Sequence, residues 1–272
     1  ASRLGVKEIE IVSNAVLLDR KEKVDVLKQA GLTHAFVSLH AHDERLSRGL
    51  TQKAGDFPKT VAGVKNLVEA GVVTVLNHVI SSRNFRFLEK YVEFVALEFG
   101  PGRVMVSFAF VTPQYKALEN LDLVPKLSEA MPYLRRALRK ALELKVPFIV
   151  GSRQGVPPCF LKEFRGWSDV FDLAHEAASE DAFQKERGEA CGRCRYRNQC
   201  TGLWKPYAAR FGFGELEPVP GEPFTDAEVR EFSVISRKPP WGVHESFDEV
   251  AGPLRDREAE AAGPPPVEEA AL

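Results

Sequence analysis

The amino-acid sequence predicts an α/β protein in which a parallel sheet is followed by a small cysteine-rich domain. Segments with the patterns of strands and helices alternate five times over residues 1–150. This rhythm is typical of parallel strands joined by right-handed crossovers, in an open sheet or a closed barrel. All four cysteines of the chain come after this region. The sequence therefore separates an α/β unit from a later segment with a different chemistry.

The predicted strands are short runs of apolar or alternating residues. The first run alternates and then becomes apolar, and residues 72–80 form an almost continuous β-branched run. A continuous run of that kind is expected of a parallel strand that is buried on both faces. In order, the predicted strands span residues 7–13, 34–40, 72–80, 103–111 and 147–150.

The predicted helices lie between these strands and have apolar residues at helical spacing. Two of them end at Gly31 and Gly71, and glycine is the usual residue just after a helix. The polar residues 42–51 predict a loop, and Pro132 predicts a break in the last helix. In order, the predicted helices span residues 19–30, 57–70, 85–99 and 123–144.

After residue 150 the chain becomes rich in glycine, proline, aromatic residues and cysteine, with only short helical patches such as 170–178. We expect residues 151–220 to form a small domain that is held together by a metal site. Residues 221–272 end in a tail of Ala, Pro and Glu. We expect them to be a C-terminal extension that is partly disordered.

The composition limits the partners of the protein. Of 272 residues, 44% are hydrophobic and 28% are charged, and the formal net charge is −1. This balance argues against a broad nucleic-acid-binding surface. No apolar run is long enough to cross a bilayer, and the amino end has no signal-peptide pattern. We expect a cytoplasmic protein without a membrane or nucleic-acid partner.

Three cysteines lie within ten residues in the spacing C-x2-C-x5-C, and the fourth lies upstream. Two cysteines that are two residues apart can bind one metal ion or one edge of a cluster. Disulfides or buried thiols are the alternative, which the polar, Arg-rich surroundings disfavour. The spacing leaves zinc and an iron–sulfur cluster open. The predicted ligands are Cys159, Cys191, Cys194 and Cys200.

Polar residues follow the carboxyl ends of four predicted strands, which is where parallel α/β folds bind their ligands. This grouping suggests one shared polar ligand. The residues are Ser13, Asn14, Ser38, His40, Asn77, His78 and Thr112.

Three of these strand ends resemble motifs of the radical S-adenosylmethionine (radical SAM) enzymes. Residues 11–15, Ile-Val-Ser-Asn-Ala, are similar to the third-strand motif, 36–40 to the fourth and 75–84 to the fifth. Pro-Pro-Cys at 157–159 and the cysteines and glycine of 191–202 resemble an auxiliary-cluster domain of the SPASM or twitch type. The resemblance covers about residues 1–220.

The resemblance implies a partial (β/α)6 radical SAM barrel, similar to a TIM barrel, with an auxiliary [4Fe–4S] domain. In such enzymes a first [4Fe–4S] cluster binds S-adenosylmethionine and cleaves it reductively to a 5′-deoxyadenosyl radical, which abstracts a hydrogen from the substrate. The resemblance implies that the substrate is either a peptide or a cofactor precursor, which is a small molecule. It also implies an electron donor such as a flavodoxin or ferredoxin.

The resemblance also implies roles for individual residues. Ser13, with Asn14 beside it, and Ser38 would contact the amino-acid part of S-adenosylmethionine, and Asn77 its ribose or carboxylate. His40 and His78 would line the pocket. The four cysteines would ligate the auxiliary cluster, which then has no open iron and would relay electrons or stabilise the domain.

Two parts of the family pattern are missing from this sequence. The C-x3-C-x2-C loop and the glycine-rich "GGEP" loop are absent, and Ala15 replaces a glycine. We expect that the chain lacks its first two β/α units, and that the full-length protein supplies the second [4Fe–4S] cluster. A degenerate member with only the auxiliary cluster is the other interpretation.

Two further hypotheses do not use the family. A zinc-stabilised module could bind nucleic acid or protein through basic and aromatic residues near the cysteines: Arg193, Arg195, Arg197, Lys205, Tyr196 and Trp204. A hydrolase metal site could form at His40, His42 and Asp43, although no third convergent ligand beyond the histidines is evident. The three arginines could also offset the negative charge of a cluster.

Overall fold

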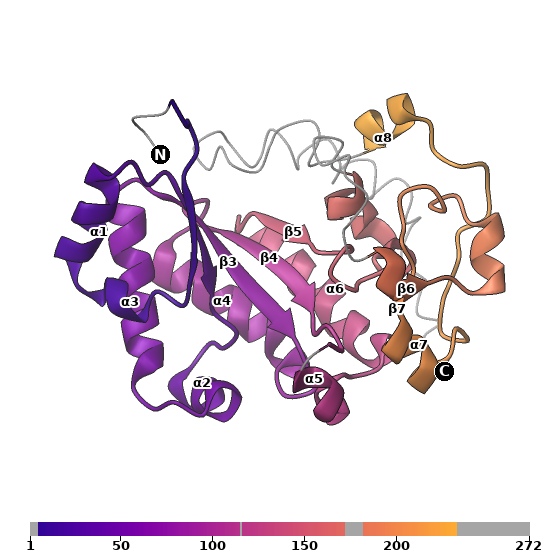
Figure 1. Ribbon diagram of the computed structural model, residues 1–272, viewed down its shortest axis with the longest axis horizontal. Helices are drawn as coiled ribbons and strands as arrows, with labels where there is room; N and C mark the ends of the chain where they lie inside the picture. Colours follow the sequence, from indigo (N-terminus) through magenta and orange to yellow (C-terminus); the bar gives the residue numbers. More distant parts are fainter. Residues whose placement is uncertain (1–4, 115, 172–181, 233–272) are drawn as a thin grey trace, which may run out of the picture.

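A five-stranded parallel sheet forms the centre of the molecule in the computed structural model, which describes residues 5–114, 116–171 and 182–232 (Figure 1). The strands follow one another in the sheet in the order of the sequence. Each pair of neighbours is parallel, which confirms the predicted α/β class. The strands are β1 (Glu10–Ser13), β2 (His34–Ser38), β3 (Val73–Ile80), β4 (Met105–Phe110) and β5 (Phe148–Val150).

Helices connect consecutive strands and bury one face of the sheet. Figure 1 shows α1, α3 and α4 gathered on one side of the sheet, as sequential right-handed crossovers require. Helix α4 also packs along α6. The α-helices of this unit are α1 (Lys21–Gln29), α2 (Glu44–Thr51), α3 (Asp56–Glu69), α4 (Leu88–Phe99), α5 (Lys116–Glu119) and α6 (Leu127–Glu143). Short 3-10 turns are η2 (Val16–Asp19), η3 (Phe85–Phe87) and η4 (Leu121–Leu123).

The predicted loop over residues 42–51 was wrong, because most of it is helix α2. Asp43 is the N-cap of this helix, and its Oδ1 accepts a hydrogen bond from the Leu46 backbone N–H at 2.7 Å. Glu44 then accepts a hydrogen bond from the Gly55 backbone N–H at 2.8 Å. A cap and a polar exposed surface stabilise this short helix although it has little apolar patterning.

The predicted break at Pro132 was also wrong. Helix α6 runs continuously from Leu127 to Glu143 with Pro132 inside it. The proline lies near the amino end, where the helix loses only one backbone hydrogen bond. A buried stripe of apolar residues, including Leu134 and Leu138, holds the helix in the hydrophobic core, where it packs along α4.

The segment after β5 shares the hydrophobic core of the sheet. Trp167 stacks on Phe148 of β5, with ring centres 5.5 Å apart, and the Tyr207 hydroxyl accepts a hydrogen bond from the Leu127 backbone N–H at 2.7 Å. The segment contains a two-stranded antiparallel sheet. Its elements are η5 (Pro158–Phe160), η6 (Lys162–Trp167), η7 (Asp169–Phe171), η9 (Ala182–Gln184), β6 (Lys185–Glu186), η10 (Glu189–Arg193), β7 (Leu203–Trp204) and α7 (Lys205–Phe211).

Of the predicted helical patch at 170–178, Val170 and Phe171 form the end of η7, and the remainder lies outside the described residues. Figure 1 shows β6, β7 and α7 at the end of the molecule opposite α1. This end holds all four cysteines.

Residues 218–232, which we call the C-terminal strap, pack on the cysteine loop. The strap ends in helix α8 (Asp226–Phe232), and Thr225 and Glu228 exchange hydrogen bonds in a capping box at its start. Phe224 stacks on Tyr196, with ring centres 5.4 Å apart. The predicted extension therefore begins as a packed segment, and the predicted tail lies outside the described residues. In the described part of the chain, no helix is long and apolar enough to cross a membrane.

Candidate metal centre and strand-end site

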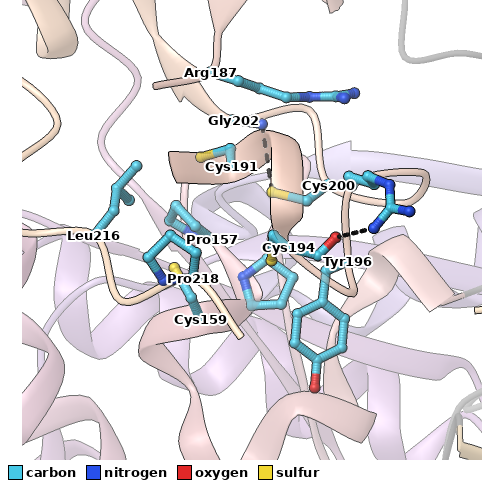
Figure 2. A pocket seen from close by; sticks show the side chains of 12 residues that line it. Pro157, Cys159, Arg187, Cys191, Cys194, Tyr196, Cys200, Gly202, Leu216 and Pro218 are labelled. Carbon is cyan, nitrogen blue, oxygen red and sulfur yellow. Dashed lines mark hydrogen bonds between the residues drawn. The ribbon is translucent and has the colours of Figure 1, made fainter. Parts of the chain in front are cut away.

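The four cysteines line one pocket (Figure 2). Cys159 comes from η5, just after β5, and the other three come from the loop between β6 and β7. The pocket encloses about 380 Å³ of space, part of it open to solvent. The structure thus brings together the four predicted ligands, although 32 positions separate Cys159 from Cys191 in the numbering of the sequence. The other residues that line the pocket are Pro157, Pro158, Arg187, Tyr196, Arg197, Gly202, Leu216 and Pro218.

Backbone N–H groups face several of the sulfur atoms. The Gly202 N–H donates to Cys200 Sγ at 3.4 Å. Backbone hydrogen bonds from Glu217 and Gly188 favour the thiolate forms of Cys159 and Cys191 in the same way. Hydrogen bonds of this kind are common around metal-bound thiolates, whose negative charge they stabilise.

Gly202 can make its bond to sulfur only because it has no side chain. Its φ of +90° lies in the region that favours glycine, and a Cβ at this position would lie 2.1 Å from the Glu186 carbonyl oxygen. The glycine after the third loop cysteine therefore permits both the turn and the close approach of β6.

Burial raises the pKa of three of these thiols, which favours their protonated forms. It raises the pKa of Cys159 to about 12 and that of Cys200 to about 11, and the neighbouring sulfurs add to both shifts. The pKa of Cys191 is also raised, chiefly by burial. A metal that binds here must displace protons from sulfur, so its binding strengthens as the pH rises.

The four cysteines are a candidate donor set for a metal centre. In the described ranges, no three His, Cys, Asp or Glu side chains lie close enough together to hold a single metal ion. One zinc ion holds each sulfur about 2.3 Å away and so draws four sulfurs closely together. An iron–sulfur core spaces its thiolates farther apart, because several metal atoms lie between them. Four thiols that line one pocket are a donor set that such a cluster could use.

A row of polar side chains crosses the middle of the main sheet. Ser38 of β2 pairs with Asn77 of β3, which pairs with Ser107 of β4, so the three side chains lie on one face of the sheet. Asn77 Oδ1 is buried and has no hydrogen-bond partner among the described residues. The sequence analysis missed Ser107, whose signal is a single hydroxyl in an otherwise apolar strand.

Ser13 and Asn14 shape the turn that follows β1. Ser13 pairs with Val37, so strand alternation places it on the face opposite Ser38. Its Oγ accepts a hydrogen bond from the Ala15 N–H at 3.0 Å, and Asn14 Oδ1 accepts one from the Val16 N–H at 3.2 Å. Ala15 has a φ of 56°, so this position favours the glycine that the family motif has there.

The two histidines at the strand ends have different surroundings. His40 Nδ1 accepts a hydrogen bond from the Val79 N–H at 3.2 Å, and burial lowers the pKa of His40 to about 4. His78 faces the helices and lies completely buried beside Tyr91, with ring centres 4.0 Å apart. Burial holds the pKa of His78 well below its usual value. His78 therefore does not share a face with the polar row.

The hypothesis of a hydrolase metal site has little support. Asp43 caps α2, and its other carboxylate oxygen lies 3.2 Å from His42 Nε2. His40 uses Nδ1 to accept the bond from Val79. These side chains already have structural partners.

Comparison with known families identifies the first part of the chain. Residues 1–95 match the model of the Radical SAM superfamily. This part of the chain is therefore similar to a radical SAM domain. The matched residues include β1, β2 and β3, and with them Ser13, Asn14, Ser38, His40 and Asn77. The cysteine pocket lies outside the matched residues.

Two archaeal proteins are similar to this chain over about 100 residues. One is named a probable GTP 3′,8-cyclase of Sulfurisphaera tokodaii and is 33% identical over 98 residues, which are 36% of this chain and 30% of the relative. The other, of Sulfolobus acidocaldarius, has the same name and is 29% identical over 94 residues, 34% of this chain and 29% of the relative. The match thus spans less than a third of each curated relative.

Proposed function

We propose that this chain is part of a radical SAM enzyme that cleaves S-adenosylmethionine reductively and abstracts a hydrogen from a small molecule. The observation that carries the proposal is the match of residues 1–95 to the Radical SAM superfamily. The matched residues hold two of the three side chains of the polar row, Ser38 and Asn77. The reactive step belongs to the cofactor, and the protein binds, orients and shields it.

The polar row supplies groups that could bind S-adenosylmethionine. The serine hydroxyls can donate or accept, and the Asn77 amide offers a buried oxygen without a partner in the described part of the chain. A ligand amine or hydroxyl that donates to this oxygen would remove the cost of leaving it unpaired. His40 would lie at the edge of the site as a neutral ring, because its pKa is low.

The cysteine pocket would hold an auxiliary [4Fe–4S] cluster through Cys159, Cys191, Cys194 and Cys200. When bound, such a cluster supplies electron transfer. Four protein thiolates leave no iron open to a substrate. We therefore assign the pocket to electron relay and to holding η5 against the loop between β6 and β7.

The first cluster must come from other residues. All four cysteines lie in the pocket, and the chain has no C-x3-C-x2-C sequence. The proposed activity is thus that of a protein that contains three further cysteines outside these 272 residues. Its electron donor would be a low-potential carrier such as a flavodoxin or ferredoxin.

The names of the relatives favour a small-molecule substrate over a peptide. Both relatives are named as enzymes that cyclise GTP, a nucleotide. A cofactor precursor of similar size is the substrate class that we propose for this chain.

The metal centre can be tested on this chain alone. After anaerobic reconstitution with iron and sulfide, we expect about four irons and four sulfides per chain and a broad absorbance band in the visible. Cys194→Ala should lose most of the bound iron, whereas Asn198→Ala, an exposed neighbour in the same loop, should keep it. One zinc and no iron would instead support the zinc-stabilised binding module.

The activity can be tested on the longer protein that carries a C-x3-C-x2-C loop. With dithionite and S-adenosylmethionine it should form 5′-deoxyadenosine. Asn77→Leu should weaken S-adenosylmethionine binding roughly 10- to 100-fold, the effect of losing one buried polar contact. If Asn77→Leu binds S-adenosylmethionine as tightly as wild type, the polar row does not bind this cofactor.

A further inference from the structure

The arginines nearest to the cysteines in sequence do not supply the charge that lines the pocket. The Arg195 guanidinium lies 4.2 Å from the centre of the Phe224 ring and pairs with Glu228 at 2.9 Å. Arg193 is exposed and does not line the pocket. The arginines that do line it are Arg187 and Arg197.

The charge of Arg197 is largely balanced by its own contacts. Its Nη1 donates to the carbonyl oxygens of Cys194 at 3.2 Å and of Gly221 at 2.9 Å. Its Nη2 lies 3.3 Å from the Glu222 carboxylate. Arg197 thus ties the C-terminal strap to the cysteine loop and shares its charge with a carboxylate.

Arg187 combines an exposed position with a place in the pocket wall. Figure 2 shows its side chain extending past Gly202, on the side of Cys191 and Cys200. Its stem packs closely on this glycine, since a Cβ at Gly202 would lie 3.0 Å from Arg187 Cγ. In the described part of the chain, Arg187 makes no ion pair shorter than 4 Å.

We propose that Arg187 sets the reduction potential of the cluster that this pocket would hold. The inference rests on the proposed function. A cluster held by these cysteines would supply one-electron transfer: it would gain one electron from a low-potential donor, such as a flavodoxin or ferredoxin, and the donor would be oxidised by one electron. No bond of the protein forms or breaks, and the cluster becomes more negative by one charge. A nearby positive charge therefore stabilises the reduced form more than the oxidised form and raises the potential.

A redox titration of the reconstituted chain tests this role. Arg187→Ala should shift the midpoint potential to a more negative value. At a fixed ambient potential, its ratio of reduced to oxidised cluster should fall roughly three- to tenfold, as expected for one partly screened charge within a Debye length. Arg187→Lys keeps the charge and should stay close to wild type. Arg193→Ala removes another exposed charge from the same region and should shift the potential less.

The outcomes separate this inference from the proposed function. Iron and sulfide counts are measured on every variant before the titration. An intact cluster whose potential is unchanged in Arg187→Ala overturns the role of Arg187 and leaves the metal centre standing. Equal shifts in Arg187→Ala and Arg193→Ala overturn it as well, because they show a general effect of net charge. A wild-type chain that binds no iron overturns the proposed metal centre and this inference together.

Discussion

Lys185 and Trp204 face each other across the β6–β7 pair, with Lys185 Nζ 4.4 Å from the centre of the Trp204 ring. The ammonium group also donates a hydrogen bond to the Arg153 carbonyl oxygen, and its positive charge favours the ionised form of the buried Asp169. Lys185 is itself only 6% exposed. This contact joins the pair of strands that frames the cysteine loop to the end of β5.

Lys185→Met should destabilise the protein by about 2–4 kcal/mol, because it removes a buried cation from its ring and carbonyl partners and leaves Arg153 as the remaining positive charge beside Asp169. Urea denaturation followed by tryptophan fluorescence measures the change. Lys205→Met is the control, since Lys205 is exposed at the start of α7. Equal losses of stability in the two variants would show that the buried contact of Lys185 does not stabilise the protein more than an exposed lysine does.

Gly202→Ala should damage the cysteine pocket. The added Cβ meets the Glu186 carbonyl oxygen, and the positive φ disfavours any side chain. We expect a loss of about 2–4 kcal/mol in stability together with less iron bound after reconstitution. Gly192→Ala in the same loop is the control, because a Cβ there would meet nothing within 4 Å. Normal iron content in Gly202→Ala would contradict the role given to the Gly202 turn.

His40 should make the stability of the protein depend on pH. Its folded-state pKa of about 4 lies below the usual 6.5, so its contribution is fully present above pH 6.5 and is lost as the pH falls toward 4. Since one pKa unit corresponds to about 1.36 kcal/mol, the full loss amounts to about 3 kcal/mol. His40→Asn keeps an acceptor for the Val79 N–H but cannot be protonated. Denaturation curves at pH 7 and pH 5 should therefore differ less for the variant than for wild type, and an unchanged difference would contradict the assignment.

Phe224 should protect the cysteine loop from solvent. It is 8% exposed and packs between Tyr196 and the Arg195 guanidinium. Phe224→Ala should cost about 2–4 kcal/mol in stability and speed the loss of iron in air. Phe183→Ala is the control, because Phe183 is 72% exposed. If both variants lose iron at the wild-type rate, the strap does not shield the pocket.

The sequence predicted what depends on regular patterns and on rare residues. The long β-branched run of β3 and the helical spacing of α4 placed both elements within a few residues of their ends. The four cysteines could be grouped because cysteine is rare in this chain and its spacing is restrictive. The structure brings them into one pocket, while their role as metal ligands and the identity of the metal stay predictions.

Other features depend on contacts that leave no pattern. Helix α2 follows from one cap and has few apolar positions, so its residues looked like a loop. Arg187 reaches the pocket because β6 and β7, of two residues each, pair with each other. Strands this short have no periodicity to detect. Ser107 could have been found as the one hydroxyl in β4, once the register of three strands was known.

The order of the strands in the sheet has a consequence for folding during translation. Because β1 to β5 lie side by side in the order of synthesis, each new strand can join the growing edge as soon as its crossover helix has emerged. Tyr207, which bonds to Leu127, comes only after the sheet has been made. Folding and translation can therefore proceed in the same direction, and the cysteine-bearing end closes last.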